Sequence, residues 1–126
     1  MLVVDSHVYI DLILAGKDVR FLLQPWILSG DLLGCGVIRA EVLRGILSQK
    51  IRNDLSDLFD VIPEIPTNPR LWREVADLAW RMDRKGKVIP LTDVIIAACS
   101  MWVGATVISE DRHFAMVPGL KTQSRL

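Results

Sequence analysis

The stretch from Asp93 to Ser109 reads DVIIAACSMWVGATVIS. Up to Val103 it is apolar nearly all round, which predicts a buried helix that ends at Gly104. Thr106 to Ser109 then has the β-branched composition of a short buried strand. A buried helix that leads directly into a buried strand is a recurring unit of α/β proteins, so this stretch predicts a fold of that class.

Further strand patterns occur on both sides of this stretch. Leu2-Val3-Val4 predicts a first strand, Asp31 to Gly36 a second, and Leu120 to Thr122 a last one. Because helical patterns separate them, we expect an α/β/α sandwich in three layers with a mostly parallel central sheet. The short piece Val61 to Pro66 is expected to be extended and broken by its prolines.

The expected helices have recognisable starts and ends. Asp18, Asn68 and Thr92 are the expected N-caps of three of them, and Pro25 is an expected irregularity. One face of the helix after Asn68 carries Trp72 among its apolar residues. The expected helical ranges are 8–14, 18–30, 37–48, 50–59, 69–86 and 93–103, with a short helical turn after Ser109.

Composition limits the class of protein. The chain has 126 residues, 51% of them hydrophobic, which fits one domain over residues 1–126 with a sizeable core. Lys plus Arg and Asp plus Glu both number 15, so any nucleic-acid role must come from local patches or from site chemistry. Cys35 and Cys99 lie in apolar runs and are expected to be buried free thiols.

A membrane location is disfavoured although Asp93 is the only charged residue from Val88 to Ser109. Pro90, Asp93 and the break at Gly104 argue against one spanning helix. The N-terminus lacks the basic region of a signal peptide. We therefore expect a cytoplasmic protein that does not enter a membrane.

Four acidic residues are candidates for a site. Asp5 ends the first strand and Asp111 follows the strand of Thr106 to Ser109, where ligands bind in open parallel sheets. Asp93 opens a helix that should be buried, and a buried carboxylate needs a partner or a metal. Glu41 lies in a largely apolar helix. Helix capping for the aspartates, and a solvated ion pair of Glu41 with Arg44, are the alternatives.

Clustered carboxylates repel one another unless cations lie between them. Mg²⁺ or Mn²⁺ prefers such oxygen ligands, and can orient a water, lower its pKa and stabilise charge on a phosphodiester under attack. If the fold gathers these four residues, the set predicts metal-assisted phosphodiester hydrolysis.

The chain resembles PIN domains, specifically the VapC-type toxins of toxin–antitoxin pairs. The resemblance covers essentially the whole length in four ordered blocks, at residues 3–10, 37–45, 86–98 and 107–114. It implies a metal-dependent endoribonuclease that forms a homodimer and is neutralised by a cognate antitoxin protein. It also implies that Mg²⁺, or Mn²⁺ in its place, is held by Asp5, Glu41, Asp93 and Asp111.

Other residues have supporting roles in this comparison. Ser6 and Ser109 would hydrogen-bond to the acids, and Thr92 would support the site from the start of its helix. His7 departs from the commoner Ser, Thr or Asn of the family and is expected to be structural, whereas His113 and Glu110 are expected on the surface. The candidate RNA contacts are Arg44, Arg84, Lys87 and Arg112.

Three other functions are considered. A catalytically inactive PIN-like binding scaffold would need altered geometry, because all four acids are present. A housekeeping RNA-processing nuclease is disfavoured by the short chain without added domains. A phosphoacceptor signalling domain would need paired acids after its first strand, where this chain has Ser6 and His7 after Asp5.

Overall fold

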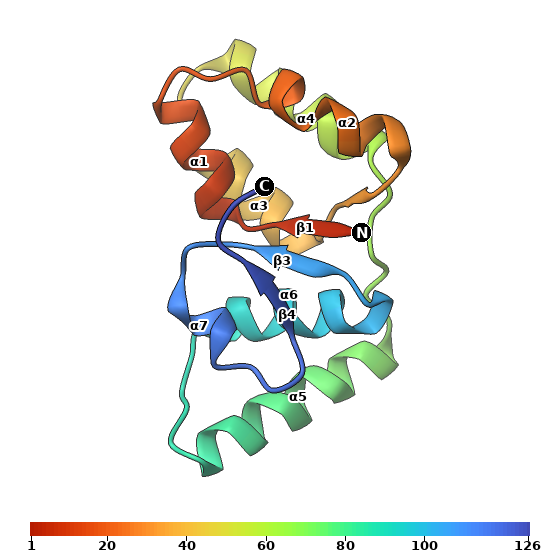
Figure 1. The fold of residues 1–126 in the computed structure, drawn as a ribbon, viewed down its shortest axis with the longest axis vertical. Helices are drawn as coiled ribbons and strands as arrows, with labels where there is room; N and C mark the ends of the chain where they lie inside the picture. Colours follow the sequence, from red (N-terminus) through yellow and green to blue (C-terminus); the bar gives the residue numbers. More distant parts are fainter.

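Four short strands form one parallel sheet in the computed structural model, which describes residues 1–126 (Figure 1). The sheet has the order β2-β1-β3-β4, and every neighbouring pair is parallel, with Val3 opposite Val107 in the centre. All strands therefore end at the same edge, where Asp5 and Ser109 follow the two central strands. The strands are β1 (Leu2–Val4), β2 (Leu32–Leu33), β3 (Thr106–Ile108) and β4 (Lys121–Gln123).

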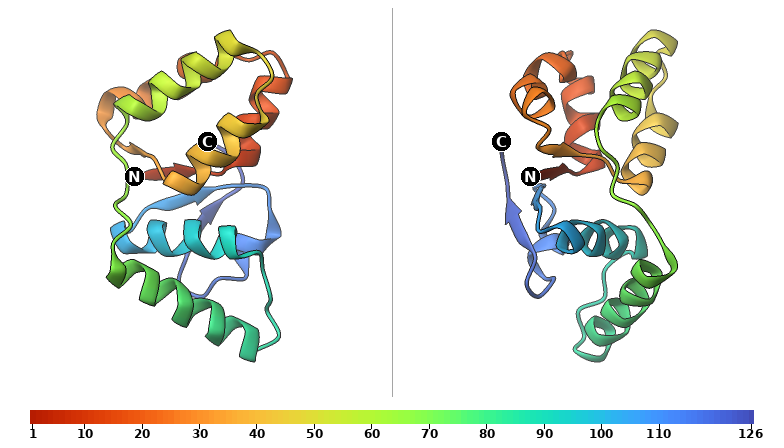
Figure 2. Two further views of the ribbon diagram at one scale, coloured as in Figure 1. Left: turned by 180° about the vertical axis from the view of Figure 1, so that it is seen from behind. Right: turned by 90° about the vertical axis from the view of Figure 1, so that its right-hand side faces the viewer.

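Seven helices surround the sheet. In Figure 1, α1 to α4 lie above the strands and α5 to α7 lie below them, and Figure 2 shows the arrangement from two further sides. This confirms the expected three-layer α/β/α sandwich. The helices are α1 (Ser6–Leu14), α2 (Val19–Ser29), α3 (Gly36–Gly45), α4 (Gln49–Val61), α5 (Pro69–Arg84), α6 (Leu91–Val103) and α7 (Arg112–Ala115).

The core is built around α6. Every residue of α6 from Asp93 to Ser100 is buried, as its apolar composition predicts. The Ser100 hydroxyl donates to the carbonyl of Ile96 at 2.8 Å, which satisfies a buried polar group within the helix. Cys35 and Cys99 are buried free thiols, as expected. One cluster of 31 buried hydrophobic residues connects the layers.

Two of the three predicted caps are confirmed. Asp18 accepts from the amide of Phe21 at 3.2 Å, and Asn68 accepts from the amide of Leu71 at 2.9 Å. The prediction for Thr92 is wrong, because α6 begins at Leu91 and its N-cap is Pro90. The Pro90 carbonyl accepts from the amides of Asp93 and Val94 instead. Thr92 lies one position inside the first turn and is exposed.

Some element boundaries also differ from the prediction. The second strand is only Leu32–Leu33, because Gly36 already belongs to α3. Gly34 instead pairs with the extended segment after α4, donating to Pro63 and accepting from Ile65. The third helix ends at Gly45, and Ser48 caps the next one through the amide of Ile51. The last strand is Lys121–Gln123, one residue later than predicted.

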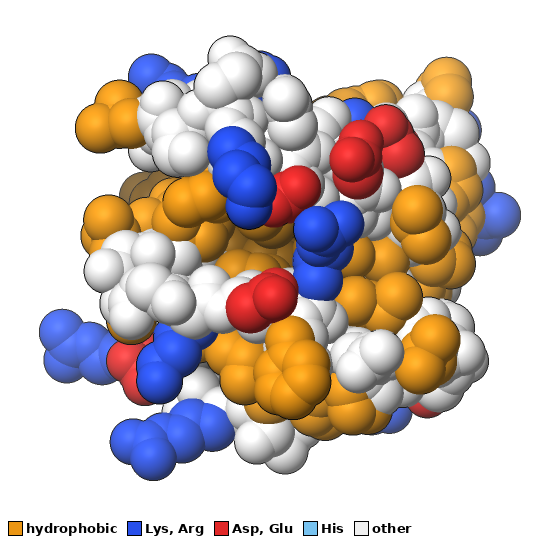
Figure 3. Space-filling view, turned by 90° about the horizontal axis from the view of Figure 1, so that it is seen from above, with side chains coloured by type: hydrophobic (Ala, Val, Ile, Leu, Met, Phe, Trp, Pro, Cys, Tyr) orange, Lys and Arg blue, Asp and Glu red, His pale blue; other side chains and the backbone are white.

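Several large apolar side chains are exposed. On α5, Trp72 is 45% exposed and Trp80 is 60% exposed. Figure 3, which views the molecule from the α2 and α4 side, shows a hollow with apolar side chains in and around it, bordered by charged ones. None of the helices has the length and apolar character needed to span a membrane.

Candidate metal centre

Asp5 lies at the junction of β1 and α1, at the centre of the sheet edge. Asp5 is only 1% exposed, and its backbone amide donates a hydrogen bond to the carbonyl of Ile108 across the β1–β3 pair. The carboxylate does not cap α1, which excludes the capping alternative for this residue. Its Oδ2 instead accepts from the Ser109 hydroxyl at 2.9 Å. Asp5 is thus a buried acid that faces other side chains at the end of the sheet.

Ser109 connects Asp5 to Asp111. The Asp111 amide donates to Ser109 Oγ at 3.0 Å, which leaves the Ser109 hydroxyl proton free to donate to Asp5. Asp111 Oδ1 also accepts from the amide of His113 at 2.9 Å, so Asp111 does cap α7. The capping alternative is therefore correct for Asp111, and its carboxylate faces the same cluster.

Ser6 makes the corresponding link to Glu41 on α3. Its hydroxyl lies 3.3 Å from Glu41 Oε1 and 3.4 Å from Asp5 Oδ1, and its one proton can donate to only one of them at a time. Glu41 forms no ion pair with Arg44, and the ion pair of α3 joins Arg39 to Asp60 at 2.6 Å. The structure therefore places Glu41 against Asp5.

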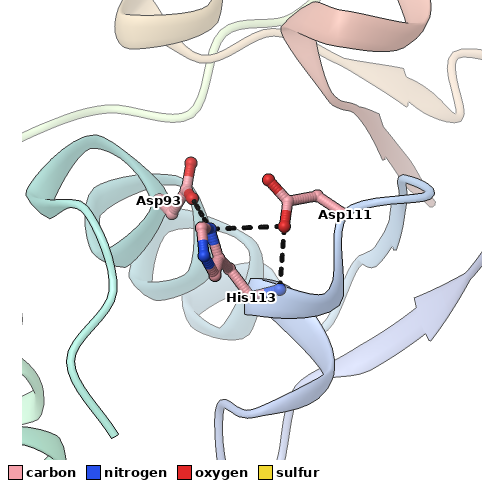
Figure 4. Close-up of side chains that lie close together, drawn as sticks. All are labelled: Asp93, Asp111 and His113. Atoms are coloured by element: carbon pink, nitrogen blue, oxygen red, sulfur yellow. Dashed lines mark hydrogen bonds and ion pairs between the residues drawn. The ribbon is translucent and has the colours of Figure 1, made fainter.

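Asp93 completes the group from the first turn of α6. Figure 4 shows its carboxylate beside the His113 ring, with Asp111 on the other side of the ring nitrogen. His113 Nδ1 lies 3.0 Å from Asp93 Oδ2 and 3.2 Å from Asp111 Oδ1. Potential ligand atoms of these three residues all lie within 4.8 Å of one another. Four segments far apart in the sequence thus converge on one small region.

Burial and the neighbouring acids act on the ionisation of Glu41 and Asp93. Burial raises the pKa of Glu41 above its ordinary value, and the charges of Asp5 and Asp93 raise it further, while the Ser6 hydrogen bond opposes them. Burial likewise raises the pKa of Asp93, with additional contributions from Asp111 and Asp5, and the His113 hydrogen bond lowers it. The charged forms of Glu41 and Asp93 are therefore disfavoured, first by burial and then by the negative charges beside them.

This donor set fits a divalent cation. Carboxylate oxygens are the ligands that Mg²⁺ and Mn²⁺ prefer, and the repulsion seen in the pKa values of Glu41 and Asp93 is what a bound cation would relieve. The imidazole of His113 adds a nitrogen donor, which suits Mn²⁺ better than Mg²⁺.

His113 was expected on the surface, and the structure places it in the cluster with a side chain 40% exposed. The sequence signal was its position two residues after Asp111. Because Asp111 caps a short helix through the His113 amide, the two side chains are brought together. His7 has an exposed ring whose Nδ1 lies 3.5 Å from Asp5 Oδ2, and Glu110 is exposed as expected.

The remaining predicted residues lie outside the cluster. Thr92 is exposed and has no side-chain hydrogen bond that caps α6. The guanidinium of Arg84 packs over the Trp80 ring at 5.1 Å from its centroid. The four cations proposed to contact RNA, all of them exposed, are Arg44, Arg84, Lys87 and Arg112.

A parallel sheet between helices, with buried carboxylates at the carboxyl edge of its strands, defines an α/β protein with a candidate metal centre. The sequence matches the PIN domain family over residues 2–120, and the chain belongs to that family of nucleases. No curated protein sequence matches the chain.

Solved structures share the fold at low sequence identity. VapBC from Salmonella typhimurium, bound to DNA, has a TM-score of 0.79 at 15% identity. VapBC2 from Rickettsia felis, bound to a promoter DNA fragment, has a TM-score of 0.78 at 16% identity. FitAcB from Neisseria gonorrhoeae has a TM-score of 0.67 at 18% identity. Each comparison covers 97% of this chain and 96% of the other one.

Proposed function

We propose that this chain is a divalent-metal-dependent endoribonuclease and the toxin of a toxin–antitoxin pair. The observation that carries the nuclease assignment is the convergence of Asp5, Glu41, Asp93 and Asp111, in which burial and then the neighbouring charges raise the pKa values of Glu41 and Asp93. A purely structural role does not account for two buried and two half-buried carboxylates at one sheet edge.

The four acids would hold the cation, and His113 would stand beside it. A bound Mg²⁺ or Mn²⁺ supplies positive charge for a phosphodiester and lowers the pKa of water. Ser109 fixes the position of Asp5 relative to Asp111, and Ser6 fixes Asp5 relative to Glu41. These hydrogen bonds keep the carboxylates in place before a cation arrives, which reduces the cost of ordering them.

RNA is the proposed substrate. Arg112 follows Asp111 directly, and Arg44 lies in the last turn of α3, the helix that carries Glu41. Neither forms an ion pair with a carboxylate in the structure. Exposed and unpaired cations near an acidic centre are suited to phosphate groups, which the centre alone would repel. Lys87 and Arg84 would extend this path along the end of α5.

A protein partner is proposed for the surface seen in Figure 3. Leu14, Phe21, Leu28 and Val61 belong to α1, α2 and α4, and each is more than 70% exposed, which is unusual for side chains that meet only water. The chain shares its fold with VapBC and FitAcB structures and resembles VapC-type toxins of toxin–antitoxin pairs, and we propose a cognate antitoxin as the partner here. We also propose a homodimer, for which the exposed Trp72 is available, and a cytoplasmic location.

Purified protein incubated with total cellular RNA tests the nuclease assignment. We expect discrete products with Mg²⁺ or Mn²⁺, none with EDTA, and none from Asp5→Ala under any of these conditions. Asp83→Asn is the matched control, because Asp83 is an exposed acid of α5 outside the cluster. Inducing the wild-type chain alone in cells should arrest growth, and Asp5→Ala should not.

The outcomes separate the alternatives. No cleavage by folded, antitoxin-free wild-type protein would favour the catalytically inactive binding scaffold. Cleavage without growth arrest would favour a housekeeping RNA-processing nuclease. Equal growth arrest by wild type and Asp5→Ala would show that toxicity does not come from catalysis.

A further inference from the structure

A second cavity lies beside the acidic cluster and is not used by the metal centre. Its volume is about 360 Å³, and it shares Ser109 and Asp111 with the cluster. This volume is near the lower end of the range for small-molecule sites, roughly 300–1,000 Å³, so one nucleotide unit is a suitable occupant. Because Asp111 borders both sites, the occupant would lie next to a phosphate held at the cluster.

Part of the wall of this cavity is apolar. Val8 and Leu12 line it from α1, Ile108 from the end of β3, and Leu126 from the end of the chain. Val8 and Leu12 lie four residues apart on α1 and therefore on the same face of that helix. Aliphatic side chains of this kind pack well against the flat faces of an aromatic ring system such as a nucleobase.

Three charged side chains of the cavity form no ion pair within the protein, whereas Asp111, which also lines it, lies 3.2 Å from His113 Nδ1. The three are Asp11, Glu110 and Arg125. Two carboxylates accept hydrogen bonds and one guanidinium donates them, so the cavity offers both kinds of group to a ligand.

We propose that this cavity is a nucleobase subsite for the residue next to the scissile phosphate, and that it prefers guanine. Guanine presents adjacent N1–H and N2–H donors to a carboxylate, while its O6 and N7 accept from an arginine. Adenine, cytosine and uracil lack two adjacent ring-edge donors. The inference rests on the proposed RNA cleavage and adds a specificity determinant, with Asp11, Glu110 and Arg125 as binding residues.

Methyl NMR on the full chain tests this subsite without depending on cleavage. With Mg²⁺ present, guanosine 5′-monophosphate should shift the methyl signals of Val8, Leu12, Ile108 and Leu126. Inosine and adenosine monophosphates should bind about tenfold more weakly, since each lacks part of the donor edge.

Variants with matched controls identify the groups responsible. Asp11→Asn and Arg125→Gln should each weaken guanosine monophosphate binding by about tenfold. Asp77→Asn and Lys121→Gln should leave it unchanged, because these exposed residues do not line the cavity. All four positions are exposed, so folding is not at risk.

Equal shifts with all nucleotides, or none with any, would overturn the inference. Shifts of these methyl signals by arginine amide alone would also overturn it and indicate a protein side chain as the occupant. RNA cleavage by the wild type together with no guanosine monophosphate binding would overturn the subsite and leave the nuclease assignment intact. Absence of RNA cleavage would count against the proposed function itself.

Discussion

Asp5, Glu41, Asp93 and Asp111 could each be singled out from the sequence because each is an acid in an apolar setting or at a strand end. The sequence also indicated Ser6 and Ser109, which hydrogen-bond to Asp5 in the structure. His113 could not be predicted in the same way. Its place depends on the geometry of a four-residue helix that Asp111 caps, and periodicity is too weak to show this in so short an element.

At the residue scale, the raised pKa values of Glu41 and Asp93 make the stability of the metal-free protein depend on pH. The folded chain binds protons at Glu41 and Asp93 more tightly than the unfolded chain, because folding raises both pKa values. This contribution to stability is fully present below the ordinary carboxyl pKa of about 4. It is lost as the pH rises through the raised values of the two carboxyls.

We therefore predict that, in EDTA, a Glu41→Gln/Asp93→Asn double variant gains stability relative to the wild type as the pH rises from 4 to 7. Thermal unfolding followed by circular dichroism would show the melting temperature of the double variant rising relative to that of the wild type. The difference should grow by roughly 4 °C for each kcal/mol of change in the free energy of unfolding. Parallel melting curves across this pH range would show that the carboxylates do not repel one another in the folded state.

At the scale of elements, the sequence predicted which segments are helices better than where they begin. Asp18 and Asn68 were recognisable because each accepts a hydrogen bond from the amide three residues later. Thr92 looked like a similar cap, but the proline two residues before it supplies the N-cap position through its backbone carbonyl. The earlier start makes Asp93 the third helical residue, still in the first turn, and its Oδ2 lies 3.0 Å from His113 Nδ1.

Two cap substitutions test this assignment of helix starts. Asn68→Ala should lower the free energy of unfolding by about 1 kcal/mol, because it removes the acceptor for the Leu71 amide. Thr92→Ala should change it by less than about 0.5 kcal/mol, as expected of an exposed residue without a cap bond. Urea unfolding at equilibrium measures both. A loss at Thr92 equal to that at Asn68 would mean that Thr92 caps α6 after all.

At the scale of the whole molecule, the alternation of strands and helices was enough to predict the sandwich and its parallel sheet. The sequence did not determine the strand order, because strands of two or three residues carry little pairing information. The central pairing of β1 with β3, in which Leu2 lies opposite Thr106, joins the first strand to a strand late in the sequence. That pairing brings Asp5 and Ser109 into contact across 104 positions of sequence.

The candidate metal centre is thus a product of the tertiary fold, and no single segment contains it. The β1–α1 junction, α3, α6 and the turn after β3 each contribute one acid. The fold belongs to the PIN domain family, and the low identity to VapBC structures shows that it persists when most residues differ.

Isothermal titration of the metal-free protein with Mn²⁺ measures directly whether the converged acids form a metal centre. We predict saturable binding by the wild type, binding weakened at least about tenfold in Asp93→Asn, and unchanged binding in Asp83→Asn. Weak, non-saturating heats that are the same for all three proteins would contradict a metal centre at this sheet edge.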